Sequence, residues 1–334
     1  MISWSPTSPL SGLEMDESPQ RTLAWKKGLF LVAVLGLLVF VGLLFWGDAQ
    51  AVGAKLLELS PSLAILLVFL SALDYYFRFL RWQFLLKPFH FALRYQESLI
   101  VFLAGLSLSA TPANLGEAVK SFLLEKKEIP VSKTLPVVFA ERLSDGSGIA
   151  LLATVGAIRF HYGWTALVAF LCFFLFAMLL VSRERWFYSM TRFLRSRGKF
   201  LRLVQSLDSF YSSVRLVFTW KRLLFAILLS SCSAFFQTLA FFCLLRGIYA
   251  PITFMEALFF LNLSSIAGGV SFSPGGLVVV EGSLMALLLA RQIPVEAAAT
   301  SVLVVRFFNL WLGFIVGIFA LRWTIAHWVL GERY

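Results

Sequence analysis

Residues 222–245 read RLLFAILLSSCSAFFQTLAFFCLL, a stretch whose one charged side chain stands at its first position. A helix needs roughly 20 apolar residues to cross the hydrocarbon layer of a bilayer. Lipid offers the backbone no hydrogen-bond partners, so such a stretch spans as a helix unless its strands close into a barrel. Barrel strands alternate apolar and polar side chains, and this stretch does not. It therefore predicts a transmembrane helix.

Similar apolar runs are spread along the chain, at residues 28–47, 62–86, 134–158, 164–182 and 298–322. With the first stretch they predict about six transmembrane helices. The composition agrees, because 59% of the residues are apolar and the mean hydropathy is +0.84. Soluble domains are only about 45–50% apolar. We expect an all-α polytopic membrane protein whose residues 25–330 form one transmembrane domain.

The formal net charge is +11, and the Lys and Arg residues gather in loops and at the ends of the apolar runs. This distribution is typical of positive-inside topology and of contact with anionic lipid head groups, so we expect no nucleic-acid partner. Residues 1–24 are rich in Ser and Pro, which predicts a disordered cytoplasmic tail. Ala49-Gln50-Ala51 resembles a signal-peptidase site, but the preceding apolar run is longer than a signal-peptide core and predicts an uncleaved anchor.

Two further apolar regions, 97–124 and 255–291, are interrupted near their middles. The interruptions are Thr111-Pro112-Ala113-Asn114-Leu115-Gly116 and Ser271-Phe272-Ser273-Pro274-Gly275-Gly276. Pro removes a backbone donor and Gly weakens a helix, so each region predicts a broken helix pair. Non-helical backbone at membrane depth is tolerated where protein buries it or where it lines a wet cavity. The alternative is a pair of ordinary kinked spans.

Charge predicts that both regions turn back within the membrane. Ten Lys or Arg against two acids lie between Arg183 and Arg222, which makes the loop 183–221 cytoplasmic. With a cytoplasmic N-terminus, an even number of crossings must precede this loop, and that count requires region 97–124 to be re-entrant. We expect the second broken region to enter from the opposite face. Both termini are then cytoplasmic, in a multi-pass protein of the inner (plasma) membrane.

The two broken regions share one pattern of spacing. A Glu, a Pro, an Arg and a final polar residue follow one another at intervals of 13, 12 and 3 in both copies: Glu117, Pro130, Arg142 and Asp145, then Glu281, Pro294, Arg306 and Asn309. Ile-Pro-Val recurs at 129–131 and 293–295, and aligning the preceding prolines needs one two-residue offset. Because three crossings separate the copies, we predict an inverted repeat with halves at about 62–158 and 222–322.

Inverted repeats are typical of transporters, whose substrates bind where discontinuous helices meet. Ionisable side chains at membrane depth usually pair or face a cavity. We therefore predict a substrate site made of Asn114, Gly116, Glu117, Lys120, Arg142, Asp145, Pro274, Gly275, Gly276, Glu281, Arg306 and Asn309. The bases would attract an anionic head group, while Glu117 and Glu281 exchange protons or balance charge. The alternative is a structural ion-pair network without transport.

Smaller patterns lie outside this set. Asp74 and Arg78 have the i, i+4 spacing of a helical ion pair. Arg81 with Trp82 predicts an interfacial anchor. Gly313 and Gly317 predict a close helix contact. The three cysteines fall in apolar runs without metal-ligand spacing, and the three histidines are scattered at span ends.

Three motifs resemble a known family. They are Asn114-Leu115-Gly116-Glu117-Ala118-Val119-Lys120-Ser121-Phe122-Leu123-Leu124, Glu141-Arg142-Leu143-Ser144-Asp145 and Pro274-Gly275-Gly276-Leu277-Val278-Val279-Val280-Glu281-Gly282. In this order, over residues 25–325, they resemble the flippase-like family that includes the membrane region of lysylphosphatidylglycerol synthases. The resemblance implies a bacterial or archaeal protein that moves a lipid or a lipid-linked sugar between leaflets.

The matching positions are Gly116, Glu117, Lys120, Glu141, Arg142, Asp145, Pro274, Gly275, Gly276, Glu281 and Gly282. Lys120 stands where the family often has Arg, which keeps the charge and loses bidentate phosphate geometry. The sequence ends at Tyr334 without a soluble aminoacyltransferase domain, so lysyl transfer is not expected.

The sequence favours a lipid translocase, passive or proton-coupled, that binds an anionic phospholipid or a polyprenyl-phosphate sugar. One alternative is a membrane-embedded glycosyltransferase with a polyprenyl-phosphate donor, although no Asp-x-Asp metal pair is present. Another is a non-transporting accessory subunit of a lipid-synthesis complex, so homo-oligomers and lipid-synthesis enzymes are the partners considered. No Walker loop or zinc-binding motif occurs, and no cofactor or metal is expected.

Overall fold

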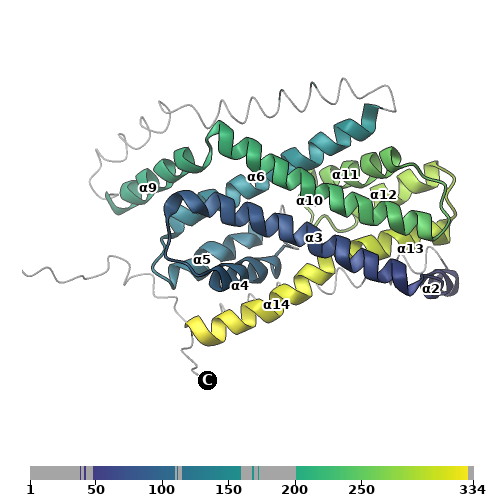
Figure 1. The fold of residues 1–334 in the computed structure, drawn as a ribbon, viewed down its shortest axis with the longest axis horizontal. Coiled ribbons are helices and arrows are strands. Elements are labelled where there is room, and N and C mark those ends of the chain that lie inside the picture. Colours follow the sequence, from purple (N-terminus) through teal and green to yellow (C-terminus); the bar gives the residue numbers. More distant parts are fainter. Residues whose placement is uncertain are drawn as a thin grey trace, which may run out of the picture.

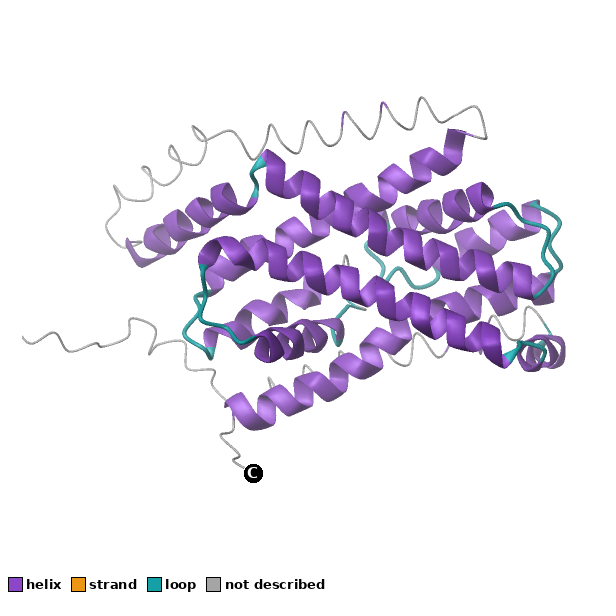
Figure 2. Cartoon of the chain, in the orientation of Figure 1, coloured by secondary structure: helices purple, strands orange, loops and turns teal. Residues whose placement is uncertain are grey.

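The structure is a computed structural model. It describes residues 48–109, 111, 115–158 and 201–329, together with the single residues 38, 41, 42, 168 and 172. All regular elements within these residues are helices (Figures 1 and 2). The expected tail 1–24 and the expected spans 28–47 and 164–182 lie outside the continuously described ranges, as does Asn114.

The long helices follow the apolar runs. They are α3 (Pro61–Leu86), α6 (Val131–Ala157), α10 (Trp220–Gly247), and a C-terminal series of α13 (Val295–Arg306), the π-helical segment η4 (Phe307–Trp311), α14 (Leu312–Thr324) and the π-helical segment η5 (Ile325–Val329). Three helices are long and apolar enough to cross a membrane: Pro61–Phe89, Trp220–Gly247 and Val295–Trp328. A membrane protein is thereby supported, while the number of spans stays a prediction.

Helix α6 covers the expected run 134–158 and carries charged residues in its middle. At 27 residues it is about 40 Å long at 1.5 Å per residue, which exceeds the roughly 30 Å hydrocarbon layer. Its middle charges keep α6 out of the three apolar helices named above, so a membrane crossing by α6 stays a prediction.

Both interrupted regions form broken helix pairs, as predicted. The first hairpin consists of α4 (Tyr95–Leu106), the short 3-10 helix η2 (Leu115–Ala118) and α5 (Val119–Glu125). The second hairpin consists of α11 (Phe254–Val270) and α12 (Val279–Ala290). A capping box starts α11, because Thr253 and Glu256 each bond the other's backbone.

The two hairpins lie at opposite ends of the bundle, with α3, α6 and α10 running along it between them (Figure 1). Helix α10 packs against α3 and α6, α11 against α6, and α14 against α4. This arrangement is the one that oppositely inserted hairpins require. The inverted repeat itself remains a prediction from the spacing.

Each hairpin packs on its own hydrophobic core. Buried Trp82, Leu85, Val101, Leu124 and Leu223 belong to the core around the first hairpin. The core around the second hairpin contains the buried side chains Phe241, Leu284, Met285, Ala298 and Val302. Lys120, one of the charged residues of the next section, packs against Trp82 and Phe102 of the first core.

Glycines allow the helices to approach closely. A Cβ on Gly317 would overlap the backbone of Leu106 and Ser107, and one on Gly313 would lie 2.6 Å from the Tyr75 hydroxyl. The predicted close contact at these glycines is confirmed, and it joins α14 to the first hairpin and to α3.

The remaining elements are α2 (Ala49–Leu57), the 3-10 helix η1 (Lys87–Phe89) and α9 (Leu201–Val217). Helix α9 lies within the basic loop 183–221, where the sequence predicted only a loop. It packs against α6, where Ser209 and Ser132 share a hydrogen bond of 3.1 Å.

Candidate functional site

The two hairpin interruptions meet near the middle of the bundle. The backbone N–H of Gly275 donates to the carbonyl of Thr111 at 3.4 Å. Figure 2 shows loop segments in this central region, between the helices of the two ends. Residues 164 positions apart in the chain are therefore neighbours, and non-helical backbone from both copies faces one place.

Local sequence explains each interruption. The Thr111 hydroxyl donates to the carbonyl of Leu108 at 2.8 Å and accepts the N–H of Gly116 at 2.6 Å, which closes the first turn. In the second turn Gly275 and Gly276 have φ of 60° and 68°, a conformation that side chains disfavour. The predicted positions Pro274, Gly275, Gly276 and Gly116 all lie in these turns.

Matched ion pairs flank the two turns. Arg142 Nη2 lies 3.0 Å from Glu117 Oε2, and Arg306 Nε lies 2.5 Å from Glu281 Oε1. Each Arg follows its Glu by 25 residues, the sum of the first two repeat intervals. The spacing that defined the repeat therefore corresponds to one contact formed twice, from the second half of a hairpin to the helix that follows it.

The first copy extends its pair into a buried network. Lys120 is fully buried, and its Nζ donates to Glu117 at 3.0 Å and to Glu141 at 2.6 Å. The same ammonium lies 4.7 Å from the centre of the Trp82 ring, a cation–π distance. Two carboxylates and an aromatic face thus replace the water that this cation loses.

Arg81 corrects the sequence prediction. It was expected to be an interfacial anchor, but only 1% of its surface is exposed. Its guanidinium pairs with both oxygens of Asp145 and donates to Ser230 at 2.5 Å. Trp82 is buried as well and donates to Ser98 at 3.1 Å. Arg81 is buried because α6 and α10 cover this face of α3. Its contacts with Asp145 and Ser230 offset the cost of burying a guanidinium there.

Asp74 ties α3 to α10. It accepts from Arg78 at 2.9 Å, which confirms the predicted i, i+4 pair. It also accepts from the hydroxyl of Ser233 and from the amide of Gln237, the latter at 3.0 Å. The structure also places Arg142 3.1 Å from Asp145, as their i, i+3 spacing predicted.

Comparison with known proteins agrees with this geometry. Residues 33–317 match the family model described as the lysylphosphatidylglycerol synthase TM region. The chain belongs to this family. Among curated proteins, no match is found. Membership and the apolar helices establish a membrane protein connected to lipid handling.

In this member of the lysylphosphatidylglycerol synthase TM region family, the described acids and bases that form the network near the first hairpin are equal in number. Around the first hairpin, the structure describes a connected network of three bases and three acids, Arg81, Lys120, Arg142, Glu117, Glu141 and Asp145. A separate pair, Asp74 and Arg78, lies on α3. The second copy adds Arg306 and Glu281. Buried ions survive when they are paired in this way.

The second copy contains a buried hydrogen-bond acceptor that no described residue uses. Arg306 Nη2 donates to the backbone carbonyl of Gly275 at 2.8 Å, so its guanidinium bridges Glu281 and the turn. Glu281 Oε2 is buried and accepts no hydrogen bond from any residue that the structure describes.

The last predicted residue, Asn309, lies in the π-helical segment η4, which sequence reasoning missed. π-Helical turns leave backbone groups without their usual partners and often mark functional positions. Here the Tyr75 hydroxyl donates to the carbonyl of Phe308 at 3.1 Å. The chain thus has an irregular helix turn immediately after Arg306, and Tyr75 of α3 forms a hydrogen bond to it.

Proposed function

We propose that this protein is a lipid translocase that passes a phosphate-bearing lipid head group between leaflets at the meeting point of the hairpin turns. One observation carries the proposal: the turns touch through Gly275 and Thr111, and a matched Glu–Arg pair flanks each of them. Interrupted helices that meet in this way are the usual construction of a transporter's binding site.

The second copy supplies the chemistry for head-group binding. Arg306 holds a carboxylate through one nitrogen and a backbone carbonyl through another. A phosphate oxygen competes for the same donors, because an Arg fork binds carboxylate and phosphate in similar geometry. When the guanidinium turns to the lipid, Glu281 loses its partner and takes up a proton or a donor from the head group. Each passing head group thereby replaces Glu281 as the partner of Arg306 for a time.

Reconstituting the full chain in liposomes tests this proposal. Lipids labelled on the head group, either phosphatidylglycerol or a polyprenyl-phosphate sugar, are followed by chemical quenching of the outer leaflet. The wild-type protein should accelerate exchange. Arg306→Gln and Glu281→Gln should each slow it by roughly 10- to 100-fold, since a charge-assisted hydrogen bond contributes roughly 1.5–3 kcal/mol.

Lys55→Gln is the matched control, because Lys55 forms an exposed ion pair with Glu58 at 2.7 Å on α2. It should leave the exchange rate unchanged. Transfer of sugar without leaflet exchange would instead identify a membrane-embedded glycosyltransferase. Absence of both activities in a folded sample would overturn the translocase and favour an accessory role.

A further inference from the structure

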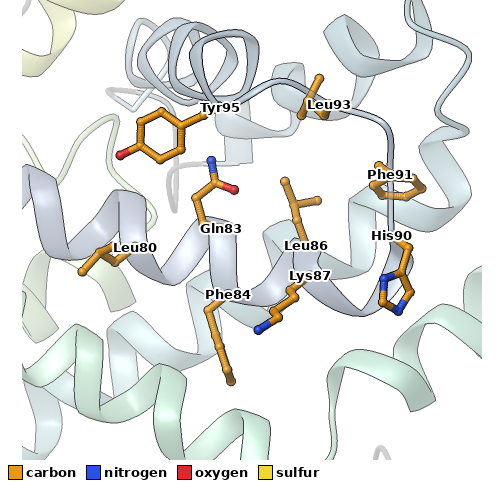
Figure 3. A pocket seen from close by; sticks show the side chains of 9 residues that line it. All are labelled: Leu80, Gln83, Phe84, Leu86, Lys87, His90, Phe91, Leu93 and Tyr95. Atoms are coloured by element: carbon orange, nitrogen blue, oxygen red, sulfur yellow. The ribbon is translucent and has the colours of Figure 1, made fainter.

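A second amphiphilic site lies away from the hairpin turns, where α3 ends. Figure 3 shows a pocket formed by the last turns of α3, the 3-10 helix η1 and the segment leading into α4. Its volume is about 470 Å³. That is within the roughly 300–1,000 Å³ of small-molecule sites and far larger than a water cluster needs.

One stripe of α3 lines the pocket. Leu80, Gln83, Phe84 and Lys87 follow the i, i+3, i+4, i+7 spacing of a single helix face. Arg81 contacts the central ion network instead, through Asp145 and Ser230. The pocket and the network therefore use different faces of the same helix.

The lining combines an apolar wall with hydrogen-bond donors and one cation, Lys87. Gln83 Nε2 is buried and donates to no residue that the structure describes. In Figure 3 its amide points toward the start of α4, at Tyr95. Lys87 and His90 add exposed nitrogens at the rim, and no Asp or Glu lines the pocket. Such a lining suits a ligand with anionic acceptor atoms and a hydrocarbon part.

The position of the pocket at the end of α3 favours a membrane lipid as its ligand. Helix α3 is long and apolar enough to span the membrane, and the pocket lies at its end. Phe84 contacts Phe225 of α10, at a centroid distance of 4.6 Å, so Lys221 and Arg222 at the start of α10 lie close to the same end. Basic residues at span ends attract anionic lipids. No acid offsets them within the pocket lining.

We propose that this pocket binds the anionic head group of a glycerophospholipid from the leaflet at which α3 ends. The Gln83 amide and Lys87 contact the phosphate region, while Leu80, Phe84 and Phe91 contact the upper acyl chains. This site holds a resident lipid and is independent of head-group passage at the hairpin turns.

Native mass spectrometry of the detergent-purified full chain, titrated with dioctanoyl phosphatidylglycerol, tests the site. Gln83→Leu and Lys87→Gln should each weaken binding about tenfold, the equivalent of one charge-assisted contact. Dioctanoyl phosphatidylcholine should bind more weakly than phosphatidylglycerol, and glycerol phosphate without chains should not bind detectably.

The control is Lys126→Gln, an exposed lysine that does not line the pocket. It should bind phosphatidylglycerol as the wild type does. Thermal unfolding without lipid verifies that each variant is folded, and Lys87→Gln at an exposed position keeps the test decisive if Gln83→Leu misfolds. Equal binding by the wild type and Lys87→Gln, or equal affinity for the two phospholipids, would overturn the proposal.

Discussion

The two copies of the repeat contain the same ion pair in different surroundings. Adding 164 to the first-copy numbers converts Lys120, Glu141 and Asp145 to Leu284, Val305 and Asn309. In the first copy Glu117 therefore has Lys120 as well as Arg142, while in the second copy Glu281 has Arg306 alone among described bases. Redundant partners make the first copy a rigid support. A single pair tied to a glycine turn makes the second copy the part suited to exchange.

The largest expected effect is the loss of the shared cation. Lys120→Met leaves Glu117 paired with Arg142 but removes the hydrogen-bonded cation of buried Glu141, and breaking a buried pair costs roughly 3–5 kcal/mol. The free energy of unfolding in detergent, from denaturant titration, measures this loss. Leu284→Met at the equivalent apolar position should cost less than about 1.5 kcal/mol. Equal losses would refute the contrast between the copies.

The second expected effect separates redundant from single pairing. Arg306→Gln strands Glu281 and should cost roughly 3–5 kcal/mol. Arg142→Gln should cost less, about 1–3 kcal/mol, because Lys120 still holds Glu117 and Arg81 still holds Asp145. The same unfolding titration compares the two variants. A greater loss for Arg142→Gln would show that the first-copy pair is not redundant.

A third change addresses the turn of the second hairpin. Gly276 has φ of 68° and an added Cβ would lie 2.8 Å from Val280 Cγ2, so Gly276→Ala should cost roughly 1–3 kcal/mol. Gly269, in α11, has open space around it, and Gly269→Ala should gain about 0.5–1 kcal/mol. Melting temperatures in one detergent give the signs. Destabilisation by both alanines would mean that the left-handed conformation of Gly276 is not the specific cause.

The smallest expected effect concerns the π-helical segment. Tyr75→Phe removes the hydrogen bond to the Phe308 carbonyl and should cost about 0.5–1.5 kcal/mol. Tyr76→Phe, at an exposed neighbouring ring, should change stability by less than about 0.5 kcal/mol. Hydrogen exchange of the η4 amides should rise in Tyr75→Phe alone. Unchanged exchange would show that the π turn does not depend on this contact.

Sequence spacing predicted much of the site. Glu117 with Arg142 and Glu281 with Arg306 were matched by interval, and both form ion pairs. The broken helices were also predicted, since Pro and Gly interrupt apolar runs at the observed turns. Helix-breaking residues and repeated intervals can both be read along the sequence without knowledge of the packing.

Other features could not be predicted in this way. Arg81 was assigned to the interface because it ends a charged triplet near a span end, and its burial depends on α6 and α10 packing over it. A weak signal existed, because three ionisable residues within two turns of an apolar helix are costly unless they are paired. Glu141 matched the family motif but was left out of the predicted substrate site, because its partner Lys120 comes from another helix.

The sequence by itself determined that this chain is a helical membrane protein with two interrupted helix pairs, because the bilayer permits long apolar runs no other backbone structure. Its spacing also matched Glu117 with Arg142 and Glu281 with Arg306. Only the tertiary structure decided that the two turns touch, that three acids and three bases share one network, and that Glu281 Oε2 is buried without a hydrogen bond from any described residue. Those facts depend on distances between helices, which packing sets and residue spacing within one helix does not.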